Sequence, residues 1–143
     1  MRQLLLCTAF GLVGCVGPNG LGSSSSELQS CSSPAFSDVT FYAAGDLDTP
    51  PVVAGPEGAQ SYVEYPYQER QRGVQGVVTV RFGVSTDGAV MCSDVARGVS
   101  SALDEAARQA IHRTVFEPGL LDGRPVVAVT ELPITFRIRQ KDT

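Results

Sequence analysis

Residue types that carry metal or redox chemistry are scarce in this 143-residue chain. It has no tryptophan, one histidine and four cysteines, and the histidine and cysteines lack the short spacing of a zinc site. The glycines fall at predicted turns, not in a strand-to-helix phosphate loop. The net charge of −4, with no basic run, argues against general nucleic-acid binding, which depends on neutralising phosphates. We therefore expect no metal, no cofactor and no nucleic-acid partner.

The chain also lacks an apolar run of the roughly 20 residues that a membrane-spanning helix needs. Residues 4–14 form a shorter apolar run after Met1-Arg2-Gln3, as in a signal peptide. The run ends in Leu12-Val13-Gly14-Cys15, which resembles the lipobox of bacterial lipoproteins. That resemblance implies a signal peptide at 1–14 and a lipidated Cys15, so that the protein is tethered to a membrane. An ordinary secretory signal, or a chance apolar N-terminus, is the alternative.

Residues 15–60 are poor in apolar side chains and rich in glycine, serine and proline. This composition is typical of a linker, so we predict a flexible tether here, with a weak strand signal only at 39–42. The remaining chain, 61–140, is predicted to form one folded domain.

The anchor of that domain is an apolar run with period-two alternation. Val78, Val80, Phe82 and Val84 share one face, as in a strand that is covered on one side. Asp87-Gly88 follows, which favours a tight turn because both positions can take positive φ. The sequence therefore predicts a hairpin with its second strand at 89–96.

Two helices and a last strand complete the prediction. Residues 67–72 form a short helix between Pro66 and Gly73, and a longer amphipathic helix runs from the Ser100 cap to Thr114 with His112 on its polar side. The last strand, 126–139, contains Pro133, which cannot donate a ladder hydrogen bond and so favours a sheet edge. The fold class is α+β: a small antiparallel sheet of about three strands, with one short and one longer helix packed on it.

The order of the motifs carries a family resemblance. They are Tyr65-Pro66, Gly73-Val74-Gln75-Gly76, the valine-rich strand, Asp87-Gly88, Leu103-Asp104, Phe116-Glu117-Pro118, Asp122-Gly123 and Leu132-Pro133. Together they resemble the C-terminal domain of TonB proteins over about half of the chain. Three places depart from the family pattern: Thr114 stands where many members carry tryptophan, Glu69 where alanine is usual, and Val63-Glu64 precedes Tyr65-Pro66 in place of a lead that contains Gln-Pro.

The resemblance implies a partner-binding surface. It predicts that Tyr65-Pro66 lies beside the surface that meets receptor peptides and that the last strand captures an extended segment by strand addition. The implied contact residues are Tyr65, Pro66, Val129, Leu132, Ile134, Thr135 and Arg137. Two alternatives stay open: Tyr65 packs under the sheet and Pro66 only sets the helix start, and the last strand is buried or self-paired in a homodimer.

The cysteines that would remain after signal removal and lipidation are Cys31 and Cys92. In an oxidising compartment a disulfide between them is one outcome, if their Cα atoms come within about 7 Å. Cys92 as a nucleophile with His112 as its base would need a cleft and an orienting acid, which the pattern does not indicate. We therefore expect a protein that is not an enzyme.

The leading hypothesis is a lipid-anchored interaction module of the cell envelope. It would face the periplasm, with the outer membrane favoured because Val16 follows Cys15. Its partner would be an envelope protein, for which the resemblance suggests a TonB-dependent outer-membrane receptor. Because the sequence shows no helix to couple to an inner-membrane motor, an accessory role is expected. The alternative is a structural lipoprotein that dimerises through its edge strand.

Overall fold

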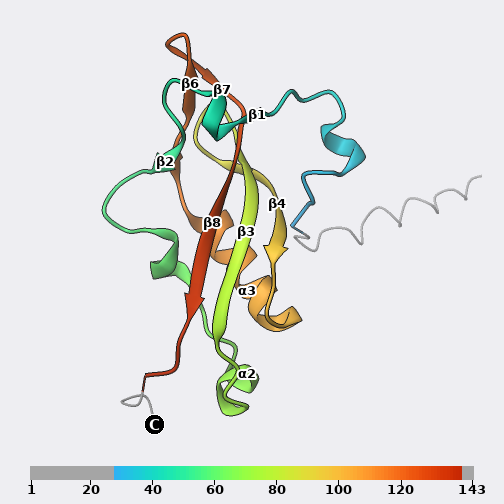
Figure 1. Ribbon diagram of the computed structural model, residues 1–143, viewed down its shortest axis with the longest axis vertical. Coiled ribbons are helices and arrows are strands. Elements are labelled where there is room, and N and C mark those ends of the chain that lie inside the picture. The colour runs from blue at the N-terminus through green and yellow to red at the C-terminus, as the bar shows by residue number, and fades with distance from the viewer. Residues whose placement is uncertain (1–27, 140–143) are drawn as a thin grey trace, which may run out of the picture.

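A four-stranded sheet in the order β1-β8-β3-β4 forms the centre of the molecule (Figure 1). The structure, a computed structural model, describes residues 28–139. The long strand β3 (Gly76–Val84) pairs antiparallel with β4 (Val90–Arg97) on one side and with β8 (Ala128–Phe136) on the other. The short strand β1 (Tyr42–Ala43) pairs parallel with the start of β8.

The β3–β4 hairpin forms at the position that the sequence predicts. The Ser85 N–H donates to the carbonyl of Ala89 at 2.8 Å, and the Gly88 N–H donates to the carbonyl of Ser85 at 3.0 Å. Gly88 has a φ of 91°, whereas Asp87 is not among the residues with positive φ. The turn therefore uses one left-handed residue rather than the two that were expected.

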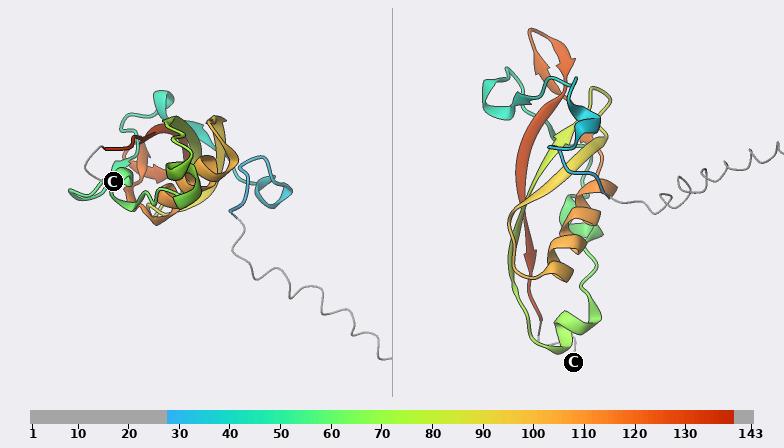
Figure 2. Two further views of the ribbon diagram at one scale, coloured as in Figure 1. Left: turned by 90° about the horizontal axis from the view of Figure 1, so that it is seen from below. Right: turned by 90° about the vertical axis from the view of Figure 1, so that its right-hand side faces the viewer.

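The two helices form at the predicted places in the sequence. The short α2 (Tyr67–Gln71) follows Pro66, and α3 (Ser101–Arg113) begins after Ser100, whose hydroxyl accepts from the Leu103 N–H at 3.3 Å. Figure 2 shows α3 against one face of the sheet. It buries an apolar stripe there: Leu103, Ala107, Ala110 and Ile111.

The hydrophobic core lies between α3 and this face of the sheet. Its members are Val78, Val80, Phe82 and Val84 of β3, Ile134 and Phe136 of β8, Leu103, Ala107 and Ile111 of α3, and Ala59 and Phe116 from the connections. The alternation of β3 is therefore real, because Val78, Val80, Phe82 and Val84 are buried in the core whereas Val77 is exposed.

Two of the departures from the family pattern, Glu69 and Thr114, lie in buried positions. Glu69 accepts hydrogen bonds from Arg72 at 2.8 Å and from the hydroxyl of Ser100 at 2.6 Å, so it joins α2 to the start of α3. The hydroxyl of Thr114 donates to the carbonyl of Ala110 at 2.8 Å. Each polar group thus has a local partner, as buried polar groups require.

An N-terminal strap, residues 28–43, begins beside α3 at Leu28, passes the outer edge of β4 and then crosses the opposite face of the sheet. The strap is fastened to β4 by a disulfide between Cys31 and Cys92, with Cα atoms 4.8 Å apart, and by a bond from the Ser93 N–H to the carbonyl of Gln29 at 2.9 Å. It then crosses Gly83, where a Cβ would lie 2.8 Å from the Phe41 ring, and reaches β8 as β1. The strap therefore links β4 to β8.

Smaller elements surround this framework. They are the 3₁₀ turns η1 (Pro34–Phe36), η2 (Ala44–Asp46) and η3 (Ala59–Tyr62), the strand pair β2 (Val52–Val53) with β5 (Phe116–Glu117), and the hairpin of β6 (Gly119–Leu121) with β7 (Arg124–Val126).

The predicted flexible tether at 15–60 needs correction from Leu28 onward. The strap, β2 and η3 all contact the domain, and Ala59 is buried in the core. Composition missed this because each contact is short and joins residues far apart in the chain. The predicted signal peptide at 1–14 and Cys15 lie outside the described residues. Within 28–139, no helix is both long and apolar enough to cross a membrane.

Candidate interaction site

The outer edge of β8 is closed at one end and free of a neighbouring strand at the other. At its start, Ala128 and Val129 pair with β1, and the Tyr42 N–H donates to the carbonyl of Val127 at 2.9 Å. From Thr130 to Phe136 no strand among the described residues pairs with this edge. The prediction of an edge strand therefore holds for the second part of β8 only.

A side chain occupies this second part of the edge. The Gln60 amide nitrogen donates to the carbonyl of Thr135 at 2.8 Å, and the Thr135 N–H donates to the Gln60 amide oxygen at 3.0 Å. A primary amide offers a donor and an acceptor side by side, as a strand residue does. Gln60 thus pairs with Thr135 as a residue of a neighbouring strand would.

These two bonds identify which backbone groups of β8 face outward. In an antiparallel ladder, opposite residues alternate between pairs that exchange hydrogen bonds and pairs that do not. Since both backbone groups of Thr135 bond to Gln60, the pair of Thr135 with Val77 exchanges none, and the groups of Pro133 and Glu131 also face outward. Because Pro133 has no N–H, the outward donors within this stretch are those of Glu131 and Thr135.

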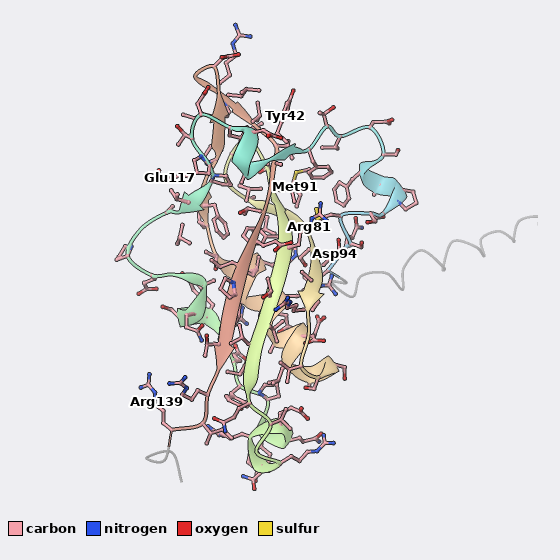
Figure 3. The ribbon with its side chains drawn as sticks, viewed as in Figure 1. Tyr42, Arg81, Met91, Asp94, Glu117 and Arg139 are labelled. Atoms are coloured by element: carbon pink, nitrogen blue, oxygen red, sulfur yellow. A yellow bond between two sulfur atoms is a disulfide. The ribbon has the colours of Figure 1, made fainter. Side chains whose placement is uncertain are left out.

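Positive charge lies at the C-terminal end of this edge. A groove of about 440 Å³ is lined by Gln60, Thr135, Arg137 and Arg139. Both arginines are exposed, and neither takes part in a salt bridge among the described residues. Figure 3 shows Arg139 beyond the end of β8. The groove therefore suits a chain segment with carboxylates.

The structure separates the predicted contact residues into two groups. Thr135 and Arg137 lie together at the free edge. Ile134 is 1% exposed and belongs to the core, and Leu132 packs against the core. Val129 is paired with Ala43 of β1. The even-numbered side chains of the last strand therefore serve folding, and period-two alternation is the signal that separates them from the odd-numbered ones.

Tyr65 packs as the alternative interpretation predicted. Its ring lies edge-on against Phe136, with centroids 5.4 Å apart, and its hydroxyl donates to the carbonyl of Val74. Burial, with a smaller contribution from Glu69, raises the pKa of the Tyr65 phenol. Tyr65 and Pro66 also line a separate surface groove beside α3. Neither residue lines the groove of Gln60 and Thr135.

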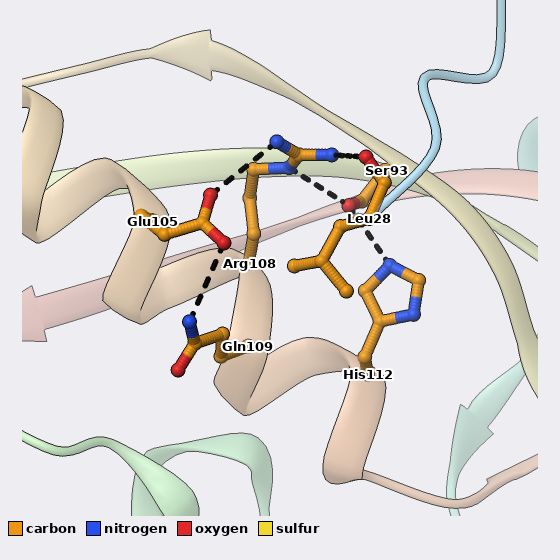
Figure 4. Close-up of polar contacts among 6 residues, drawn as sticks. All are labelled: Leu28, Ser93, Glu105, Arg108, Gln109 and His112. Carbon is orange, nitrogen blue, oxygen red and sulfur yellow. Dashed lines mark hydrogen bonds and ion pairs between the residues drawn. The ribbon is translucent and has the colours of Figure 1, made fainter. Parts of the chain in front are cut away.

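A second polar cluster lies between α3 and β4 (Figure 4). The hydroxyl of Ser93 is 3.0 Å from Nε2 of His112 and accepts from Nε of Arg108 at 3.1 Å, while Arg108 also donates to the carbonyl of Leu28. His112 lies on the polar side of α3 as predicted, but it is half-buried rather than solvent-exposed, because it faces Ser93 of β4 and Leu28 of the strap lies beside it. Burial lowers the pKa of His112, and the positive charge of Arg108 lowers it further.

This cluster resembles a serine–histidine pair in distance alone. Ser93 is 0% exposed, and its hydroxyl oxygen already accepts a hydrogen bond from Arg108. Cys92 is bonded to Cys31, so it is not a free thiol. Among the described residues, no group of three or more histidine, cysteine, aspartate or glutamate side chains is placed to hold a metal ion. The cluster instead fastens the strap to α3 through Arg108.

Fold and edge together define a small α+β domain with a partly open strand. The family model of the Gram-negative bacterial TonB protein C-terminal domain matches residues 61–138. The chain therefore belongs to this family. Among curated proteins, it is 31% identical over 93 residues to "Protein TonB" of Vibrio cholerae, a match that covers 64% of this chain and 36% of that protein. The chain thus spans little more than a third of this relative.

Solved structures of TonB C-terminal domains are also similar. The domain of Pseudomonas aeruginosa TonB has 28% identity and a TM-score of 0.46, covering 69% of this chain and 95% of that one. The domain of Helicobacter pylori TonB, residues 179–285, has 25% identity and a TM-score of 0.45, covering 57% of this chain and 75% of that one.

Proposed function

We propose that this protein is a lipid-anchored interaction module of the cell envelope. It binds an extended segment of an envelope or outer-membrane protein by adding that segment as a strand to β8, and it is accessory to TonB-dependent transport. The observation that carries the proposal is the second part of the β8 edge. No strand covers it among the described residues, and the backbone of Thr135 is paired only by the exposed Gln60 amide.

An open strand edge can bind a peptide through main-chain hydrogen bonds, while alternate side chains provide selectivity. Glu131, Pro133 and Thr135 point their backbone groups outward, and their side chains lie on the strap side of the sheet. Arg137 and Arg139 follow them and favour an acidic segment. Membership of the TonB C-terminal family supports an outer-membrane receptor as the source of that segment.

The lipid anchor is part of the same proposal. Cys15, in the lipobox-like Leu12-Val13-Gly14-Cys15, would carry the lipid and hold the domain at the outer membrane, facing the periplasm. Labelling with a radioactive fatty acid should mark the full chain and not a Cys15→Ser variant. Label on the variant would contradict this part of the proposal.

Binding rather than catalysis is favoured by the state of the nucleophile candidates. Ser93 has no exposed surface and its hydroxyl is engaged by Arg108, while Cys92 is in a disulfide. An activated nucleophile must be reachable by its substrate. Substituting His112 by alanine should therefore leave partner binding unchanged.

The experiment that tests the proposal is capture of outer-membrane proteins by the full chain and two proline variants. Thr135→Pro removes the outward N–H, whereas Val77→Pro places proline directly across the ladder, at a residue whose N–H faces away from β8. We expect a TonB-dependent receptor to be captured by the native chain and by Val77→Pro but lost with a folded Thr135→Pro. Capture that survives Thr135→Pro would reject docking at this edge.

A second candidate is self-association through the same edge. Antiparallel pairing of two copies about Ile134 would place Glu131 of one copy opposite Arg137 of the other, which favours the pair electrostatically. This structural role predicts a dimer that dissociates when Arg137 is changed to Glu. Sedimentation of a monomer at high concentration would reject it.

A further inference from the structure

We infer that the Gln60 side chain is an internal occupant of the docking edge, and that an acidic extended segment binds fully only by displacing it from Thr135. This inference rests on the proposed function, since it specifies what happens at the same edge. The side chain of residue 60 then controls the affinity of the site for its partner. The backbone of the partner takes the place of the Gln60 amide at Thr135.

The Gln60 side chain must be displaced because few backbone N–H groups of β8 point outward. Between the β1 pair and the end of β8, Glu131 and Thr135 alone provide outward N–H groups, because Pro133 has none. The Thr135 N–H and carbonyl are both bonded to Gln60. With Gln60 in place, an incoming strand could bond to Glu131 and the Pro133 carbonyl but could not continue past Pro133.

The Gln60 side chain can leave without unfolding its surroundings. Its backbone lies in η3, which the buried Ala59 fixes to the core, while the side chain itself is exposed. The two bonds to Thr135 are also exposed to solvent, where such bonds exchange with water at small net cost. A rotation of this side chain therefore opens the edge while the fold stays intact.

The charge beside Gln60 indicates what replaces it. The groove that Gln60 and Thr135 line also contains Arg137 and Arg139, which have no carboxylate partner among the described residues. A strand that passes Thr135 enters this groove with its next residues. Carboxylates at that end of the segment would compensate both arginines, so an acidic segment gains an interaction that Gln60 cannot supply.

The chain contains a matched control for Gln60. The amide oxygen of Gln75 accepts from the Ile138 N–H at 2.8 Å, also at the exposed end of the last strand. Ile138 is an even-numbered residue, and its N–H faces the β3 side rather than the free edge. Gln75→Ala therefore removes a similar amide from the same end of the strand without opening the docking edge.

The test measures binding of synthetic peptides to the full chain by calorimetry or fluorescence. Each probe is about eight residues of alternating threonine and valine with two glutamates at one end, made in both orientations. A third probe has methyl groups on its backbone nitrogens, which blocks strand addition. We expect Gln60→Ala to bind one acidic probe about three- to tenfold more tightly than the native chain, because an internal competitor is removed. Gln75→Ala should bind as the native chain does, and the methylated probe should not bind.

Amide exchange at Thr135, measured by NMR without peptide, separates failure of this inference from failure of the proposed function. Gln60→Ala should accelerate exchange at Thr135 and leave Ile138 unchanged. Unchanged exchange at Thr135, or acidic-probe binding that is equal or weaker in Gln60→Ala, would overturn the inference while leaving strand addition standing. Faster exchange at Thr135 with no probe bound by any variant would instead overturn strand addition, and displacement with it.

Discussion

The two ends of the β8 edge are closed by different means. At the start of the strand, β1 pairs through its backbone and belongs to a strap that a disulfide fastens to β4. Near the end, one exposed glutamine side chain makes two hydrogen bonds. The disulfide closes a loop of 61 residues, for which chain entropy suggests about 4 kcal/mol, whereas exposed hydrogen bonds contribute about 1 kcal/mol each. Only the second closure is therefore weak enough for a peptide to replace.

Removing the disulfide should have the largest effect on stability. We expect the Cys31→Ser, Cys92→Ser double variant to lose about 4 kcal/mol of unfolding free energy in urea titration, because the unfolded chain regains its loop entropy. Exchange of the Tyr42 amide, which bonds to Val127, should accelerate, while that of Thr135 should not. Addition of a reductant to this variant should change nothing. Equal acceleration at both amides would contradict the separation of the two ends.

Alternation along β8 provides the next test. Ile134→Ala should cost about 3 kcal/mol because it leaves a cavity in the core. Thr135→Ala, one residue away, should cost less than about 0.5 kcal/mol because the exposed side chain is lost and the backbone bonds to Gln60 remain. Chemical denaturation of both variants compares the two. A similar cost for both substitutions would mean that β8 is not buried on one face only.

Glu69 tests what holds α2 near the C-terminal end of β8. Glu69→Ala should lower stability by about 2 kcal/mol, because the Ser100 hydroxyl and Arg72 lose a buried acceptor. Arg72→Ala is the control and should cost under about 0.5 kcal/mol, since its side chain is 70% exposed. If both variants are as stable as the native protein, the bond from Glu69 to Ser100 does not contribute to joining α2 and α3.

The smallest effect that we expect is the dependence of stability on pH through His112, which lies in the cluster beside the strap. Because burial and Arg108 lower the pKa of His112 in the folded state, the unfolded chain binds the proton more readily. Stability should therefore be complete above the unfolded pKa of about 6.5 and fall as the pH decreases below it toward the folded pKa. Urea titrations at several pH values, with His112→Gln as the control, should show this loss in the native chain and not in the variant. An equal loss of stability with falling pH in both proteins would mean that groups other than His112 cause it.

The parts of the fold that could be predicted depend on neighbours in sequence. Alternation in β3 and the Ser100 cap predicted the hairpin and α3 correctly because both signals lie within one element. The pair of Gln60 with Thr135 joins residues 75 apart, and a single glutamine carries no periodic pattern. β1 and β2 have two residues each, too few for alternation to be recognised.

The candidate site could be predicted only in outline. The position of Pro133 indicated an edge, and family resemblance indicated the last strand. Neither showed that β1 covers the start of β8, since that pairing depends on where the strap crosses Gly83. The half-burial of His112 was missed for the same reason: the helical pattern assigns it to the polar face, but Leu28 of the strap lies beside that face.

Amide hydrogen exchange of the full chain, alone and with the captured envelope protein, would locate the docking surface on the domain. We expect new protection at Glu131 and Thr135, with the amides of β4 unchanged. Protection confined to β4, or to the groove beside Tyr65 and Pro66, would contradict docking on the β8 edge.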